Sequence, residues 1–275
     1  MIRYSASVAS GGTEAMPYLF KGNVEAAVET CAKNGFDAVE LHLRTPYDID
    51  RDLIMEICER NNITVSTIGT GMGYTFDRLC LTSDDENIRR DAIERIKGHI
   101  DLASFFKCAV IIGSMRGRLP EKGDRVKVLG YYRESLLTLA DYAEKRNVVL
   151  LVEPVNRYEC NFHNSSAEMK EYLATLGSDK LKILLDTYHM NIEEFGQNGM
   201  YDSIRECGEM LGHMHFADSN RKRPGAGHID FAGILRTLNE IGYDKYVAFE
   251  CLPWPDPETA SAEGLKYIKS LEGGG

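Results

Sequence analysis

Eight short runs rich in apolar and β-branched residues recur along the chain, and a longer segment with helical periodicity follows each run. The runs cover residues 2–8, 38–43, 64–69, 109–114, 148–153, 182–186, 212–217 and 246–250. Eight strands that alternate with helices in 275 residues predict an α/β fold with a single (β/α)8 TIM barrel over 1–275, of which 270–275 form a disordered tail. A doubly wound sheet is the alternative, but it has fewer strands, and SGGTEAM after the first run is a poor match to its Gly-rich phosphate turn.

Two of the predicted helices are long and clearly patterned. Ser83 and Glu86 have the spacing of a capping box, and the helical pattern then continues to Phe106. A second pattern covers 126–146, where leucines recur on one face. Both patterns support the alternation of strands with helices.

The net charge and the cysteines of the chain indicate which partners it can bind and in which cellular compartment it functions. A net charge of -10 opposes the approach of nucleic acid and favours a small-molecule partner. Apolar runs are shorter than the about 20 residues that span a membrane, and the N-terminal segment does not resemble a signal peptide. The seven cysteines are scattered without a CxxC pair, which is typical of reduced thiols. We therefore expect a cytoplasmic protein that binds neither nucleic acid nor a membrane.

Four of the predicted strands end in a side chain that can bind a metal. Glu153, Asp186 and Glu250 are each the last residue of a strand, and His215 lies near the end of another. In a barrel of parallel strands these ends meet at one rim, where buried carboxylates are costly without a cation. Three oxygen ligands and one nitrogen suit a divalent metal, manganese best, with magnesium, cobalt and zinc as alternatives.

Single residues of this set have simpler explanations. Asp186, followed by Thr187, fits a helix N-cap. His213 points to the same side of its strand as His215 but lies deeper, which fits a hydrogen-bonded core histidine. The coincidence of four such ends on consecutive strands favours the metal site over these explanations.

Three further polar residues lie in the loops that follow the same strands. Glu159, His189 and Arg221 come six, three and six residues after a strand-end ligand. Because loops at the C-terminal ends of the strands form the mouth of a barrel, these side chains are candidates to bind a substrate. Solvated loop polarity explains each of them equally well when it is considered alone.

Several motifs around these residues resemble a known family. EPVNRYE, LLDTYHMNIEE, GHMHFADSNRKRPGAGHIDF and FECLP together resemble the sugar isomerase and epimerase branch of the xylose-isomerase-like TIM barrels. Within that branch they are similar to the ketose 3-epimerases, the D-tagatose 3-epimerase group, with the 5-keto-L-gluconate epimerases as the closest match. STIGTGMGY, LTSDDENIRRDAIERI and VIIGSMRGR extend the resemblance over nearly the whole chain.

The resemblance implies a metal-dependent epimerase that acts at the carbon next to the ketone of a ketose or keto-uronate. It also implies that the protein forms a homodimer or a homotetramer. It implies that the four strand-end ligands hold the metal, that Glu153 and Glu250 also serve as acid and base, and that the three loop residues bind substrate oxygens. Where the D-tagatose 3-epimerases read HxGExNR, this chain reads HFADSNR, and its single tryptophan, Trp254, makes no evident aromatic lid. Both departures weigh against a free ketohexose as the substrate.

The implied reaction moves a proton next to a ketone. One carboxylate removes the proton, an enediolate forms, and a second carboxyl group across the barrel returns a proton to the other face. Basic residues gather in two loops at the same rim, at 116–125 and 221–223, and favour an anionic sugar such as a keto-uronate. Arg116, nearest to its strand end, is the candidate contact for the substrate carboxylate.

Other functions fit the same residues. An aldose–ketose isomerase, a hydroxypyruvate-isomerase-type enzyme or an inosose-type dehydratase would start from an enediolate or enolate on the same metal site. A phosphodiesterase of the endonuclease IV type would need more metal ligands, and Glu40 and His42 are the only candidates at the earlier strand ends. A non-catalytic sugar-acid-binding subunit would be expected to lose a ligand or a base, and the sequence keeps all of them.

Overall fold

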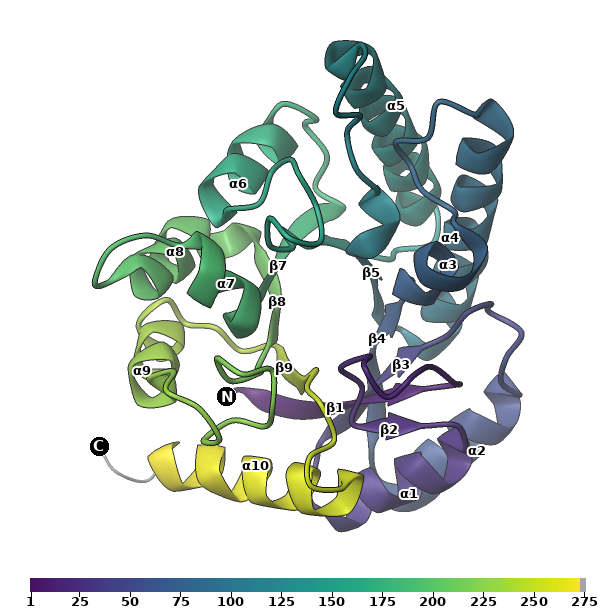
Figure 1. Cartoon of the computed structure of the whole chain (residues 1–275). Coiled ribbons are helices and arrows are strands. Elements are labelled where there is room, and N and C mark those ends of the chain that lie inside the picture. The colour runs from purple at the N-terminus through teal and green to yellow at the C-terminus, as the bar shows by residue number, and fades with distance from the viewer. Residues whose placement is uncertain (273–275) are drawn as a thin grey trace.

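A computed structural model describes residues 1–272, which form a closed barrel of eight parallel strands (Figure 1). In order around the ring, the strands are β1 (Arg3–Ala9), β3 (Ala38–His42), β4 (Thr64–Gly69), β5 (Ala109–Ile112), β6 (Leu150–Val152), β7 (Leu181–Asp186), β8 (Leu211–His215) and β9 (Tyr246–Phe249). Strand β9 pairs with β1 and closes the ring, while the two-residue β2 (Phe20–Lys21) pairs with the end of β1. The predicted (β/α)8 barrel is therefore confirmed.

Helices cover the outside of the barrel (Figure 1). They are α1 (Val24–Lys33), α2 (Arg51–Asn61), α3 (Gly71–Asp77), α4 (Glu86–Phe106), α5 (Arg125–Glu144), α6 (Ser166–Ala174), α7 (Thr187–Glu193), α8 (Gly199–Cys207), α9 (Phe231–Glu240) and α10 (Pro257–Glu272), with 3-10 turns η1 (Ser114–Arg116) and η2 (Gly208–Met210). Their apolar faces pack on the strands and form the main core. Within residues 1–272, none of the helices has the length and apolar character that crossing a membrane requires.

Two predicted boundaries are wrong. The N-cap of α4 is Asp85, whose side chain accepts from the backbone N–H of Asn87 at 2.8 Å, whereas Ser83 accepts from the N–H of Asp85. The predicted capping box therefore does not form, because the turn before the helix uses the serine hydroxyl. Helix α10 continues through 270–272, which were expected in the tail, and residues 273–275 lie outside the described residues.

The inner face of the barrel sets the position of the candidate site. Ile111, Leu151 and Leu184, on β5, β6 and β7, form a small apolar cluster separate from the main core. Because side chains alternate along a strand, Glu153 and Asp186 point to the same side as the leucines two residues before them. The two carboxylates therefore lie one layer closer to the C-terminal rim than this apolar cluster.

Candidate active site

The four predicted metal ligands come together at the C-terminal rim. Asp186 and His215 are the last residues of β7 and β8, and Glu153 and Glu250 directly follow β6 and β9. The Nδ1 atom of His215 lies 3.9 Å from Glu153 Oε1, 3.7 Å from Asp186 Oδ2 and 3.5 Å from Glu250 Oε2. All four residues are buried, and each offers one ligand atom within 4.8 Å of the others.

The donor set of this cluster fits a divalent cation. Among the described residues, Glu153 Oε1, Asp186 Oδ2 and His215 Nδ1 are buried polar atoms without a hydrogen-bond partner. Burying unpaired polar atoms beside like charges is unfavourable unless a cation joins them. Three carboxylate oxygens and one imidazole nitrogen are suitable ligands for such a cation. The cluster could therefore hold a metal.

Asp186 can serve both as the N-cap of a helix and as a metal ligand, the two roles that its sequence position left open. Its Oδ1 atom accepts from the backbone N–H groups of Tyr188 and His189, at 2.6 Å and 3.4 Å, and so caps the N-terminus of α7. Its Oδ2 atom faces the cluster and has no hydrogen-bond partner among the described residues. One carboxylate can thus cap the helix with one oxygen and offer the other to a cation.

The two candidate acid/base groups have opposite pKa shifts. Burial, together with the carboxylates of Glu250 and Asp186, raises the pKa of Glu153 well above its ordinary value. Burial alone would also raise the pKa of Glu250, but the neighbouring His215, with help from His42, holds it below the ordinary value. A raised pKa keeps a carboxyl group protonated, as an acid requires, and a lowered pKa keeps it ionised, as a base requires. The two shifts therefore suit Glu153 as the acid and Glu250 as the base of a pair.

The three predicted substrate-binding loop residues line one cavity of about 200 Å³ at this rim. The cavity is lined by Ala15, Met16, Pro17, Tyr18, Gly71, Thr75, Ser114, Glu153, Val155, Glu159, His189, Arg221 and Glu250. It is smaller than the about 300–1,000 Å³ of pockets for drug-sized ligands and matches a small, polar molecule. Glu153 and Glu250 of the cluster therefore face the same space as the three loop residues.

His189 is oriented by Asn156, a buried residue that the sequence analysis missed. The side-chain amide of Asn156 donates to Nδ1 of His189 at 2.7 Å and to Glu159 Oε1 at 3.2 Å. With its Nδ1 accepting, His189 carries its proton on Nε2, which lies 3.6 Å from Glu153 Oε1. His189 therefore presents a hydrogen-bond donor to the cavity. A lone asparagine in a loop gives no sequence signal of this role.

Arg221 is held in the cavity wall by its own loop. Its backbone is left-handed, at φ 60°, and its guanidinium binds Glu159 Oε1 at 2.9 Å. The backbone N–H of Arg221 donates to the carbonyl of Asp218 at 2.7 Å, and its carbonyl accepts from Leu252 at 2.8 Å. The buried Asp218 carboxylate, also missed by the sequence analysis, accepts from three backbone N–H groups of this loop. This framework offsets the cost of the left-handed backbone.

Arg116 does not face the cavity, in contrast to the prediction. It is fully buried, and its guanidinium donates to the carbonyl oxygens of Glu153 and Phe162 at 2.6 Å and of His163 at 3.1 Å. These carbonyls hold the guanidinium, so Arg116 supports the loop after β6 and is not placed to bind a substrate carboxylate. Of the basic residues predicted to attract an anion, Arg221 alone lines the cavity within the described chain.

Gly113 makes room for the Glu153 carboxylate, and we expect Gly113→Ala to impair catalysis. A Cβ at this position would lie 2.3 Å from Glu153 Oε2, so the carboxylate must move. Glu153 is the predicted acid or base, and displacing such a group by about 1 Å can reduce turnover about 100-fold. The measurement is kcat, with the melting temperature as a check on folding.

Gly130→Ala is the matched control, because a Cβ at Gly130 in α5 meets no atom within 4 Å. Alanine is favoured over glycine by about 1 kcal/mol within a helix, so this variant should be as active as the parent and at least as stable. Unchanged kcat in Gly113→Ala would show that the position of Glu153 is not critical.

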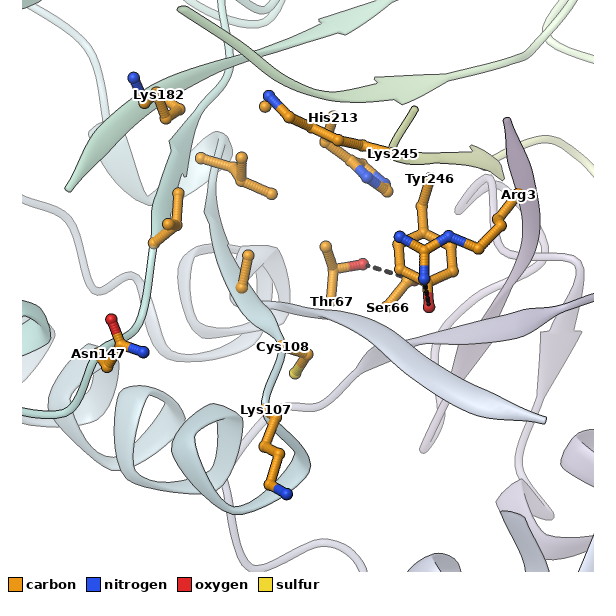
Figure 2. Close-up of a pocket in the computed structure, with 14 residues that line it drawn as sticks. Arg3, Ser66, Thr67, Lys107, Cys108, Asn147, Lys182, His213, Lys245 and Tyr246 are labelled. Carbon is orange, nitrogen blue, oxygen red and sulfur yellow. Dashed lines mark hydrogen bonds between the residues drawn. The ribbon is translucent and has the colours of Figure 1, made fainter. Parts of the chain in front are cut away.

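A larger cavity, of about 410 Å³, opens at the opposite end of the barrel (Figure 2). Arg3 and Tyr246, the first residues of β1 and β9, line it and are joined by a hydrogen bond of 2.9 Å. Lys182 and Lys245 add positive charge to its wall. Since barrels of this kind carry their chemistry at the C-terminal ends of the strands, the smaller cavity is the candidate active site.

Comparisons with known proteins agree with this geometry. A family model described as xylose isomerase-like TIM barrel matches residues 28–271. The L-ribulose 3-epimerase of Methylomonas sp. (strain DH-1) is 28% identical over 267 residues, which cover 88% of this chain and 90% of that protein. The D-psicose 3-epimerase of Enterocloster bolteae is 30% identical over 226 residues, which cover 78% of this chain and 72% of that protein.

A solved structure shares the whole architecture. The crystal structure of a D-allulose 3-epimerase from Methylomonas sp. in complex with D-allulose has a TM-score of 0.82 and 25% identity to this chain. The match covers 98% of this chain and 97% of that one. The barrel and the order of its elements are therefore common to both proteins.

Proposed function

This chain belongs to the xylose isomerase-like TIM barrel family and is a carbohydrate epimerase, and we propose that it inverts the carbon next to the ketone of a ketose. One observation carries the proposal. The carboxyl groups of Glu153 and Glu250 line a single cavity and belong to a buried cluster of side chains that could hold a metal, and their pKa values are shifted in opposite directions.

The proposed cofactor is a divalent cation held by Glu153, Asp186, His215 and Glu250. The oxygen-rich donor set suits manganese best, and magnesium, cobalt and zinc are compatible with it. When bound, the cation supplies Lewis-acid stabilisation of the negative charge that develops on the substrate. The unpaired, buried atoms of three of these side chains support this assignment.

The two glutamates exchange protons with one carbon of the substrate. In one direction, ionised Glu250 accepts the proton from the carbon next to the ketone, and the electrons of the C–H bond move toward the carbonyl to give an enediolate. Protonated Glu153 then donates its proton to the opposite face of the same carbon, which inverts the configuration. The roles of the two residues are exchanged in the reverse reaction.

The loop residues orient the sugar. The Nε2–H of His189 and the guanidinium of Arg221 are donors on the cavity wall, and Glu159 is an acceptor for a hydroxyl group. Holding the reacting carbon between two carboxyl groups converts proton transfer into a step within one complex, which contributes strongly to the rate.

A neutral ketose is the better-supported substrate. The charge of Arg221 is already paired with the Glu159 carboxylate, and Arg116 is bound to backbone carbonyls, so among the described residues the cavity offers no arginine whose charge lacks a partner. The three relatives reported above are named for ribulose, psicose and allulose. A keto-uronate of the 5-keto-L-gluconate or D-tagaturonate type is the second candidate, favoured by the position of Arg221 in the cavity wall.

The test is proton exchange with solvent. Manganese-loaded protein in deuterium oxide is incubated with D-fructose, D-allulose, L-ribulose, D-tagaturonate and 5-keto-L-gluconate, and each reaction is followed by NMR. We expect deuterium only at the carbon next to the ketone, an accumulating epimer, and a higher kcat/KM for a neutral ketose than for the keto-uronates. Protein treated with a chelator is the control.

Each other outcome has a distinct meaning. A preference for a keto-uronate would make that class the substrate and assign its carboxylate to Arg221. Exchange without an epimer would indicate an isomerase or a dehydratase that acts through the same intermediate. Failure to exchange any of these substrates, in protein shown to hold manganese, would favour a sugar-binding subunit and would contradict the proposal.

A further inference from the structure

A buried carboxylate beneath the four-ligand cluster accepts hydrogen bonds from three histidines. Glu40, on β3, is 0% exposed, and its oxygens lie 2.8 Å from His42 Nε2 and 2.9 Å from His213 Nε2. The Nε2 atom of His215 lies 3.0 Å from one of its oxygens and 3.1 Å from the other. The hydroxyl of Thr67 donates a further bond at 2.5 Å. The contacts with His213 and His215 join β3 to β8, which are not neighbours in the barrel.

The partners of Glu40 determine which nitrogen of His215 carries a proton. An ionised carboxylate only accepts hydrogen bonds, so each nitrogen that faces it must be protonated. A lone pair on Nε2 of His215 would instead point at both oxygens of Glu40 and be repelled. His215 is therefore held with its proton on Nε2. Its Nδ1 faces Glu153, Asp186 and Glu250 at 3.5–3.9 Å.

We propose that Glu40 is the positioning residue of the metal site, which fixes the tautomer and ring orientation of His215 so that Nδ1 can bind a cation. Glu40 does not line the catalytic cavity, so it acts through His215 and not on the substrate. Partners of this kind orient metal-binding histidines, and their loss typically weakens metal affinity by about 10–100-fold. The inference rests on the metal site of the proposed function.

Glu40→Gln tests the proposal with little change in shape. Both oxygens of Glu40 lie within 3.1 Å of His215 Nε2, so the amide NH2 that replaces either one will face this nitrogen. That donor opposes a proton on Nε2, and the neutral amide oxygen that remains holds the proton less strongly than the carboxylate did. More of His215 therefore carries its proton on Nδ1, where it blocks the cation. We expect the Kd for Mn²⁺, measured by titration calorimetry of chelator-treated protein, to rise about 10–100-fold.

Thr67→Val is the matched control. It removes a hydroxyl that donates to the same buried carboxylate but leaves both oxygens of Glu40 free to accept from His215. Its Mn²⁺ affinity should stay close to that of the parent, even if its melting temperature falls. Thr67 and His213 also line the cavity at the N-terminal end of the barrel, so this control perturbs the same layer of the interior (Figure 2).

Several results would overturn the proposal or its premise, and they can be told apart. Equal Mn²⁺ affinity in the parent and in Glu40→Gln would overturn the role of Glu40. A second Mn²⁺ bound by the parent and lost in the variant would also overturn it, because the cation would then lie among Glu40 and its histidines. A parent protein that binds no Mn²⁺ would instead contradict the proposed metal site.

A second measurement needs no Glu40 variant. In Mg²⁺-loaded protein with ¹⁵N-labelled histidine, long-range ¹H–¹⁵N spectra identify the protonated nitrogen of each ring. The signal of His215, one of seven histidines, is assigned by its loss in His215→Asn. We expect a proton on Nε2 of His215. A proton on Nδ1 would overturn the proposal even if Glu40→Gln failed to fold.

Discussion

Replacement of Glu153 by glutamine is expected to reduce kcat by about 10²–10⁴-fold at saturating manganese, the usual contribution of a general acid or base. An amide cannot give or take the proton, and it also replaces a buried, unpaired oxygen of the metal cluster, so manganese affinity should fall as well. Measuring kcat at several manganese concentrations separates the two effects. A kcat near that of the parent would contradict the assignment of Glu153.

Solvent exchange provides a sharper readout for the same variant. Glu250 remains in place, so it can still remove and return a proton on its own face of the substrate. In Glu153→Gln we therefore expect slow deuterium exchange into one epimer of a pair, without formation of the other. The matched variant Glu250→Gln should exchange the opposite epimer. Exchange of the same epimer by both variants would show that the two carboxyl groups do not act on opposite faces.

Loss of a residue that only orients a metal ligand typically weakens metal binding by about 10–100-fold. Asp186 is itself a proposed ligand, so we expect Asp186→Asn to lower manganese affinity by more than this. Asparagine keeps an oxygen to accept from the backbone N–H groups of Tyr188 and His189, but it replaces the unpaired Oδ2 with a donor. The variant should therefore bind little metal and have little activity. Metal-free unfolding should need as much free energy as in the parent, because the cap of α7 remains.

Asp186→Ala separates the two roles of this residue. It loses the metal-facing oxygen and the helix cap together, so its metal-free form should be about 1 kcal/mol less stable than Asp186→Asn, the typical value of an N-cap. Calorimetry with manganese and unfolding in urea provide the two readouts. Tight manganese binding by Asp186→Asn would exclude Asp186 from the ligand set.

The barrel and the cluster at its rim were predictable because both follow from short-range rules. Eight strand–helix repeats determine the fold class, and parallel strands in a barrel place their C-terminal ends at one rim. Side chains alternate along each strand, so the last residue of β7 and that of β8 have a known direction. Glu153, Asp186, His215 and Glu250 were therefore found together from sequence positions alone, while their roles remain proposals.

The predictions that were wrong or missing depend on where long side chains find partners. Arg116 and Arg221 have similar positions after their strands, yet Arg116 binds carbonyl oxygens 37 to 47 residues away and Arg221 lines the cavity. The capping box of Ser83 failed for a related reason, since its hydroxyl serves the preceding turn. The spacing of residues along the chain does not specify which hydrogen-bond partners these side chains find.

Sequence alone determined the barrel and which four residues gather at its rim, since strand periodicity and chain order are enough to place them. Only the tertiary structure revealed that Glu40 meets His215, 175 residues away, and that Asn156 orients His189. It also decided that Arg116 turns away from the cavity. A buried polar group must find a partner wherever the closed barrel brings one, and that partner is set by packing across the interior and not by neighbours in the chain.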